Sequence, residues 1–174
     1  IVIPYESGQK LTEDGRYVLT FENYDGYRAV YTFIIDTVVP EINIDGAEHN
    51  ERVNVDVAVE WAEENLTGKL YKNGEYAGEY ISGTILNKDG AYRIVVTDLA
   101  GNAAEVCFTI DKTADFNVNV NDKGLSNSVV ITGNEELTVI LTKDGVAVDY
   151  ELGDIITIPS AYTLKVSDVL GNTR

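Results

Sequence analysis

The sequence has few of the residues on which most enzyme active sites depend. Its 174 residues include one cysteine, Cys107, and one histidine, His49. A single cysteine excludes an intrachain disulfide, and one histidine far from Cys107 in the sequence leaves no nucleophile and base set. Neither a phosphate-binding loop nor zinc-ligand spacing is present. We therefore interpret Cys107 as a structural thiol within a strand and expect no catalytic site.

Basic residues are also scarce. The chain has 13 Lys and Arg against 29 Asp and Glu, which gives a formal charge of −16. Nucleic acids and anionic membrane surfaces repel such a chain, so neither is an expected partner. No apolar run approaches the roughly 20 residues that a membrane helix needs, and we expect no membrane insertion. The acidity would attract cations such as calcium, but the simpler interpretation is that it serves solubility.

What the chain does contain is an internal repeat. A glycine, a tyrosine and a second glycine recur with the same spacing in three places. The copies are Gly8, Tyr17 and Gly26, then Gly83, Tyr92 and Gly101, then Gly153, Tyr162 and Gly171. Offsets of 75 and 70 residues between the copies fit a small β-domain better than a solenoid repeat.

The repeat divides the chain into three modules. Residues 1–38 are predicted to be the C-terminal half of a module, and residues 39–112 a complete one. Residues 113–174 are predicted to lack the last strand, the equivalent of Val106–Ile110. Because the sequence begins and stops within modules, we expect it to be part of a longer protein.

The local patterns are those of β-structure throughout. Alternate valines over residues 53–59 predict one half-buried strand. Asn73-Gly74 and Asp144-Gly145, each between apolar runs, predict two hairpins with type I′ turns. No stretch has sustained helical periodicity, so the predicted fold class is all-β.

Three tyrosines begin strands shortly after a turn, which is the position of the tyrosine corner in β-sandwiches. These candidates are Tyr17, Tyr92 and Tyr162. Two residues later, antibody domains have a disulfide cysteine. This chain has Leu19, Ile94 and Leu164 there, so apolar packing takes the place of the bridge between the sheets.

The central copy carries the clearest motif. It reads Asp89-Gly-Ala-Tyr92, then Asp98-Leu-Ala-Gly-Asn102, then Phe108-Thr-Ile-Asp-Lys-Thr-Ala114. This series resembles the tandem bacterial immunoglobulin-like domains of surface and secreted proteins, chiefly of Gram-positive bacteria. The other copies depart from it, with Asn23 at the position of Asp98 and Pro159 before Tyr162.

The resemblance implies tandem immunoglobulin-like antiparallel β-sandwich modules in an extracellular protein, either on the bacterial cell surface or secreted. The function expected is a non-catalytic spacer that supports adhesion, with neighbouring modules of the same chain as partners. A module that binds a host protein or glycan is an alternative, as is an accessory region of a secreted carbohydrate-active enzyme. The first half-module could also supply the missing last strand of a third module in another chain.

Two groups of residues are candidate sites. The first has oxygen ligands suited to calcium. It consists of Asp98, Asn102, Asp168 and Asn172, with Asp111 at a module junction. The alternative is that these aspartates accept turn amides. No D-x-D-x-D-G calcium loop is present, and no other cofactor is expected.

The second candidate group is aromatic. Tyr71, Tyr76 and Tyr80 surround the Asn73-Gly74 hairpin and could stack on sugar rings. The alternative is that tyrosines simply suit strands and half-buried sheet edges.

Overall fold

The computed structural model describes residues 4–121 and 123–174, so the first three residues of the first predicted module lie outside it. Within these ranges the protein is all-β, as predicted. Its strands form antiparallel pairs, apart from the parallel pairing of β4 with β9. The described part has no helix that is long and apolar enough to cross a membrane.

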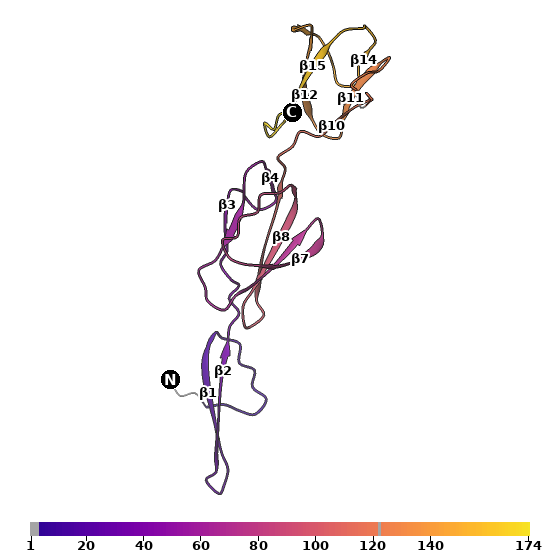
Figure 1. The fold of residues 1–174 in the computed structure, drawn as a ribbon. Coiled ribbons are helices and arrows are strands. Elements are labelled where there is room, and N and C mark those ends of the chain that lie inside the picture. Colours follow the sequence, from indigo (N-terminus) through magenta and orange to yellow (C-terminus); the bar gives the residue numbers. More distant parts are fainter. Residues whose placement is uncertain (1–3, 122) are drawn as a thin grey trace.

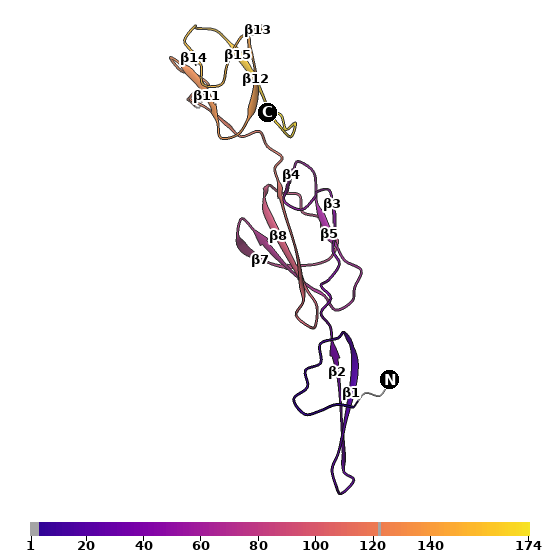
Figure 2. The same ribbon diagram turned by 180° about the vertical axis from the view of Figure 1, so that it is seen from behind.

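The sheets fall into three groups, and no sheet of the described residues joins strands from two groups. These groups lie within residues 4–38, 39–112 and 113–174, and we call them the first, central and third modules. Figures 1 and 2 show the modules one after another along the length of the molecule.

The central module is a two-layer β-sandwich. Its strands are β3 (Asn43–Asp45), β4 (Glu51–Val53), β5 (Ala58–Glu60), β6 (Thr67–Lys72), β7 (Glu75–Tyr80), β8 (Gly90–Thr97) and β9 (Ala103–Ile110). One sheet has the order β4-β9-β8-β6-β7, and the other consists of β3 and β5. Both sheets contribute to one buried core.

The alternation of side chains in β8 and β9 builds this core. Tyr92, Ile94 and Val96 of β8 are at most 5% exposed, and so are Phe108 and Ile110 of β9. The residues between them point to the other face, because side chains along a strand alternate with a period of two. Full burial of a large apolar side chain contributes roughly 1.5–3 kcal/mol, so these two strands supply much of the stability of the module.

Both predicted hairpins are confirmed. The turn of the β6–β7 hairpin has φ values of +52° at Asn73 and +84° at Gly74. The turn between β12 (Leu137–Lys143) and β13 (Val146–Val148) has +49° at Asp144 and +82° at Gly145. Positive φ at both central residues defines the type I′ turn.

The prediction of a single strand over residues 53–59 is wrong. Val53 ends β4, which pairs with β9, whereas Val59 lies in β5 of the opposite sheet. The chain crosses from one sheet to the other at residues 54–56. Val57 and Val59 are buried, but Val55 is 47% exposed because it lies in this crossing.

The first module consists of a single hairpin, β1 (Gly15–Glu22) with β2 (Arg28–Ile35). Its register matches that of β8 with β9, since Tyr17 lies opposite Phe33 just as Tyr92 lies opposite Phe108. The ring centroids are 5.4 Å apart in the first pair and 5.5 Å in the second. This hairpin therefore corresponds to the last two strands of the central module.

The third module has two small sheets. Its remaining strands are β10 (Phe116–Val118), β11 (Val129–Gly133), β14 (Ile155–Ile156) and β15 (Tyr162–Asp168). The sheet orders are β10-β11-β14 and β13-β12-β15. β15 corresponds to β8, but it lies at the edge of its sheet.

All three predicted tyrosine corners are present. The hydroxyl of Tyr17 donates to Glu13 O at 2.9 Å, and that of Tyr92 donates to Lys88 O at 2.7 Å. The hydroxyl of Tyr162 makes the same bond four residues upstream, at 3.1 Å. Each corner ties the start of a strand to the loop before it.

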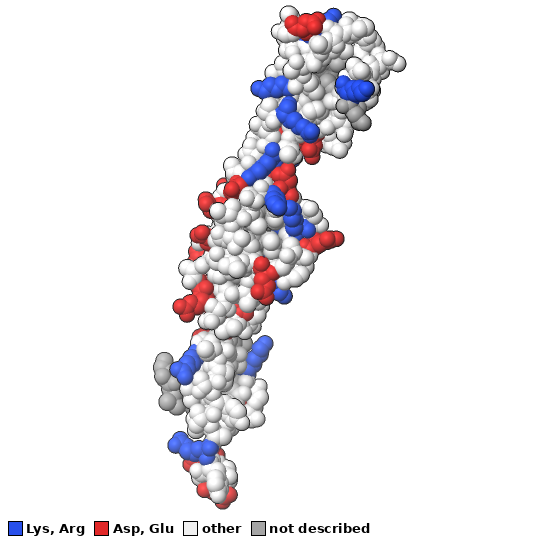
Figure 3. Space-filling model, in the orientation of Figure 1, with Lys and Arg blue, Asp and Glu red and all other residues white. Residues whose placement is uncertain are grey.

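The charge of the protein is spread over its surface. On the face shown in Figure 3, acidic side chains lie along the central module and at both ends of the molecule. Lysines and arginines lie among them and do not form a separate patch on this face.

Candidate functional site

The same set of contacts recurs at the two junctions of the molecule, residues 36–40 and 111–115. At each junction an aspartate from the preceding module accepts a backbone N–H. Asp14 Oδ1 accepts from Thr37 N at 2.8 Å, and Asp89 Oδ1 accepts from Lys112 N at 2.9 Å. Both aspartates also accept a threonine hydroxyl, from Thr37 at 2.9 Å and from Thr113 at 3.2 Å. The Asp-Gly turns thus hold the linking chain from one side.

An asparagine of the following module holds the same chain from the other side. Asn102 Nδ2 donates to the carbonyl of Asp36 at 3.0 Å. Asn172 Nδ2 donates to the carbonyl of Asp111 at 2.9 Å. These two bonds are equivalent and each crosses between modules. We call them the asparagine bridges.

The predicted calcium residues of the loops, Asp98 and Asp168, orient these asparagines. Asp98 Oδ2 accepts from Asn102 Nδ2 at 2.8 Å, and its Oδ1 accepts the amides of residues 101 and 102. Asp168 Oδ2 likewise accepts from Asn172 Nδ2, at 2.7 Å, and its Oδ1 accepts two turn amides. Both oxygens of each carboxylate therefore accept hydrogen bonds from within the turn.

These hydrogen bonds alter the acidity of both carboxyl groups. The side-chain bond from Asn102 lowers the pKa of Asp98, and the turn amides lower it further. Burial alone would raise the pKa of Asp168, but the bonds from Asn172 and the turn amides outweigh it, so the pKa of Asp168 is also lowered. Both groups are thereby held as carboxylates that accept hydrogen bonds.

A third repeated contact joins a glutamate inside each following module to a backbone amide at the start of that module. At the second junction, Glu135 Oε1 accepts from Asp115 N at 2.9 Å. Pro40 lies at the matching place in the first junction and has no N–H. The next amide, that of Glu41, donates instead to Glu63 Oε1 at 3.0 Å. A glutamate therefore accepts a backbone N–H at the start of both modules, although the donor shifts by one residue where Pro40 takes the place of Asp115.

The second junction has further contacts between modules. The Arg52 guanidinium of the central module is paired with Asp111 and with Glu135 of the third module. Asn54 Nδ2 donates to the carbonyl of Leu170 at 2.7 Å. Sequence reasoning missed Arg52 and Glu135, because nothing local links residues 83 positions apart.

The predicted calcium residues are only partly brought together. Asp111 and Asp168 lie close to Glu135, with one carboxylate oxygen of each residue within 4.8 Å of the others. Asp98 and Asn102 are at the other junction. The positive charge beside the cluster is supplied by Arg52, whose pKa is raised by hydrogen bonds to Glu135 and Asp111. This is the arrangement of an ion-pair network.

Calcium is expected to have no effect on the stability of the protein, because Arg52 already pairs with two of the three clustered carboxylates. Calorimetric titration of the metal-free chain with calcium should give no binding heat, and the melting temperature should not change. Magnesium at the same ionic strength is the control for screening of the surface charge. A saturable heat accompanied by a higher melting temperature would contradict this expectation.

The three candidate sugar-binding tyrosines lie in different environments. Tyr76 is 58% exposed, and its ring contacts that of Tyr71 edge-on at 5.6 Å. The Arg93 guanidinium covers the Tyr71 ring at 4.0 Å. Tyr80 is only 4% exposed, so the prediction that it contacts a ligand is wrong.

Tyr80 instead belongs to a second tyrosine repeat, which sequence reasoning missed. Each member donates its hydroxyl to the carbonyl four residues downstream. The members are Tyr5 with Gln9, Tyr80 with Thr84 and Tyr150 with Asp154. The hydroxyl of Tyr80 also accepts from Val59 N at 2.9 Å, and that of Tyr150 accepts from Ile131 N at 3.1 Å. This repeat could have been found in the sequence, because Tyr5 precedes Tyr17 by the same number of residues as Tyr80 precedes Tyr92.

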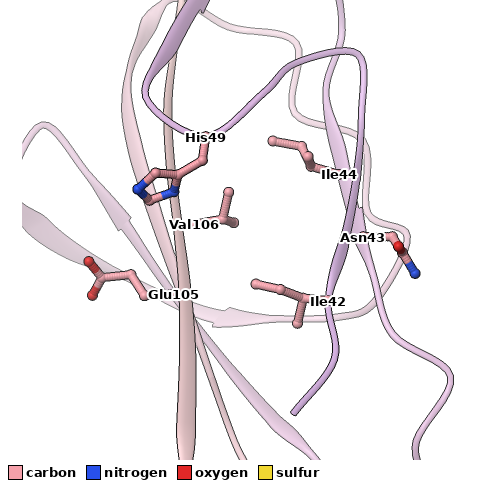
Figure 4. Close-up of a pocket in the computed structure, with 6 residues that line it drawn as sticks. All are labelled: Ile42, Asn43, Ile44, His49, Glu105 and Val106. Atoms are coloured by element: carbon pink, nitrogen blue, oxygen red, sulfur yellow. The ribbon is translucent and has the colours of Figure 1, made fainter. Parts of the chain in front are cut away.

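A shallow hollow of about 210 Å³ lies between β3 and β9 of the central module (Figure 4). Ile42, Ile44 and Val106 line it, and His49 lies at its side. His49 Nδ1 accepts a hydrogen bond from the backbone N–H of Cys107 at 3.2 Å. Burial, together with the charge of Glu105, raises the pKa of the Cys107 thiol, so it stays protonated at neutral pH. Cys107 is therefore not an activated nucleophile.

No protein-family model matches the sequence, and no curated protein matches it. The function is therefore inferred from the geometry of the junctions, the loops and the sheet edges.

Proposed function

We propose that the chain is a non-catalytic spacer of immunoglobulin-like modules in a bacterial cell-surface or secreted protein, where it holds an adhesive domain away from its attachment point. The observation that supports this proposal is the recurrence of the same hydrogen bonds at both junctions. An aspartate of the module before and an asparagine of the module after hold each linking chain. Such two-sided contacts oppose bending in either direction.

The energies involved are sufficient for a semi-rigid junction. A typical hydrogen bond contributes a net 0.5–1.5 kcal/mol, and bonds to charged groups contribute about 1.5–3 kcal/mol. Bending at a junction would break several of these bonds at once. A Gly/Ser linker without such contacts would behave as a flexible coil.

The second junction is proposed to be the stiffer of the two. It has the same bonds as the first and in addition the pairs of Arg52 with Asp111 and Glu135 and the bond from Asn54 to Leu170. The ion pairs are partly exposed and each contributes little alone. Because they act across the same interface, they add to the cost of bending there.

A ligand-binding role is the second candidate, and one observation favours it. The exposed ring of Tyr76, beside Tyr71 and Arg93, offers a small aromatic surface for a glycan or a host protein. Loss of binding in Tyr76→Ala on a glycan array would support this role. Because Arg93 already covers the Tyr71 ring, Tyr76 would be the main contact with the ligand.

Distance measurements between spin labels test the spacer role. Labels on cysteines introduced at Lys69 and Thr138, in a Cys107→Ser chain, report the arrangement of the central and third modules. A narrow distance distribution is expected. It should broaden when Arg52→Ala and Asn172→Ala are combined, because the asparagine bridge and the ion pairs at this junction are then lost.

Asn117→Ala is the matched control, because Asn117 is an exposed asparagine of β10 whose side chain takes no part in the hydrogen bonds of the junction. This variant should leave the distribution unchanged. A distribution that is already broad in the unaltered chain, or one that Arg52→Ala with Asn172→Ala does not affect, would contradict the spacer role.

A further inference from the structure

The first half of β9 has an open edge that the spacer role does not use. Among the described residues, β9 pairs with β8 along its whole length, whereas β4 pairs only with the last three residues on its other side. Next to β4, the carbonyl of Cys107 accepts from Asn50 N at 2.7 Å, and the N–H of Cys107 donates to His49 Nδ1 at 3.2 Å. Main-chain groups that face the same neighbour recur at every second residue of an antiparallel strand. Glu105 and Ala103 therefore point their N–H and C=O groups to this side, where no strand of the described residues pairs with them.

The hollow between β3 and β9 opens beside this edge (Figure 4). Ile42 and Ile44 line it from the side of β3, and Val106 lines it from β9. Val106 is 5% exposed, whereas the two isoleucines are half-buried. The volume of about 210 Å³ is smaller than the roughly 300–1,000 Å³ of a site for a whole small molecule. The hollow is therefore suited to a single aliphatic side chain.

The surface around the edge is acidic. Residues 41–51, which contain β3 and lead into β4, include no lysine or arginine, and their carboxylates are all exposed. These are Glu41, Asp45, Glu48 and Glu51. In Figure 3, acidic side chains line the side of the central module on which Figure 1 shows β3. We call these four residues the acidic rim.

The charge of the acidic rim is not compensated within the protein. Glu105 is paired with Arg93 at 2.8 Å, but among the described residues no member of the acidic rim is part of an ion pair. Uncompensated charge beside an open strand edge attracts a partner of the opposite sign and speeds its association. The partner that fits this edge is therefore positively charged.

We propose that this edge of the central module binds an extended cationic segment of a partner protein as an added β-strand. In such a segment basic and aliphatic residues alternate. Its main chain pairs with Ala103 and Glu105, and one aliphatic side chain enters the hollow between Ile44 and Val106. The basic side chains point to the opposite face, because side chains alternate along a strand. Recognition by an added strand combines main-chain bonds with pockets for alternate side chains.

A labelled peptide of alternating lysine and valine tests the proposal. Fluorescence anisotropy with the 174-residue chain should show saturable binding that weakens as salt is added. Hydrogen exchange should show new protection of the amides of Ala103 and Glu105. A peptide of alternating glutamate and valine should not bind. Absence of binding by the lysine peptide, or of protection at these two amides, would overturn the proposal.

Two methylated peptides distinguish strand pairing from attraction by charge alone. Only every second N–H of an added strand faces its neighbour. One peptide is methylated on its lysine backbone nitrogens and the other on its valine backbone nitrogens. One of the two should lose binding, and the other should keep it. Equal binding of the two peptides would overturn the proposed pairing.

Charge reversal in the acidic rim tests where the peptide binds. Glu41→Lys combined with Asp45→Lys should weaken binding by about tenfold, because both carboxylates lie beside the edge. The matched control is Glu75→Lys combined with Glu79→Lys, which changes the net charge equally on exposed positions of β7 at the far edge of the same sheet. This control should leave binding nearly unchanged. An equal loss in both variants would show that the peptide responds only to the total charge, and it would overturn the proposal.

Discussion

Phe108→Ala is expected to destabilise the central module by about 3–5 kcal/mol. Phe108 is 2% exposed and stacks on Tyr92 at a centroid distance of 5.5 Å. Its truncation would leave a cavity between the sheets, which packed neighbours fill only partly. Urea unfolding followed by Trp61 fluorescence measures the effect, because Trp61 is the only tryptophan of the sequence and packs against the core of this module. Its ring centroid is 6.1 Å from that of the buried Tyr80.

Phe33→Ala is the matched control for this prediction. Phe33 has the same place in the first module and stacks on Tyr17 at 5.4 Å, but it is 36% exposed. Since the first module has its own sheet, the Trp61 transition should shift by less than about 0.5 kcal/mol. If both variants weakened the Trp61 transition equally, the modules would unfold as one unit rather than separately.

The parts of the fold that could be predicted from the sequence depend on local geometry. A type I′ turn needs positive φ at two adjacent residues, and Asn73-Gly74 provides it within the turn itself. A tyrosine corner closes between residues four apart, as Tyr92 and Lys88 show. Repetition strengthened these predictions, because the type I′ turn occurs in two modules and the tyrosine corner in all three.

The strand error at residues 53–59 shows the limit of periodicity. Alternation indicates which side chains are buried, and Val57 and Val59 are indeed buried. It does not indicate which sheet buries them, because two sheets around one core produce the same pattern. The crossing between β4 and β5 depends on partners distant in the sequence, such as β9 for Val53.

The candidate sites were predicted less completely because their partners are distant. The sequence indicated that Asp98 and Asn102 form a turn with a special role, and it left the choice between calcium and turn amides open. That Asn102 reaches Asp36, 66 residues earlier, could not be read from spacing. Tyr80 was misplaced for a related reason: an aromatic residue near a hairpin can face either the solvent or the core.

Gly46→Ala is expected to destabilise the central module by about 3 kcal/mol, the upper end of the usual range for overpacking. Gly46 follows β3 and has a φ of +89°. A Cβ there would lie 2.2 Å from the carbonyl oxygen of Asp56 and 3.3 Å from its carbon. Both are backbone atoms of the crossing segment, so relief requires one sheet to shift relative to the other.

Gly74→Ala separates this clash from the cost of the backbone conformation. Gly74 has a φ of +84°, close to that of Gly46, and nothing lies within 4 Å of its added Cβ. The left-handed conformation alone should cost about 1–2 kcal/mol. Urea unfolding of both variants by Trp61 fluorescence gives the difference. If both variants lost the same free energy of unfolding, the crossing segment at residues 54–56 would be able to move aside. A clearly larger loss for Gly46→Ala would mean that the contact between this segment and the end of β3 fixes the spacing of the two sheets.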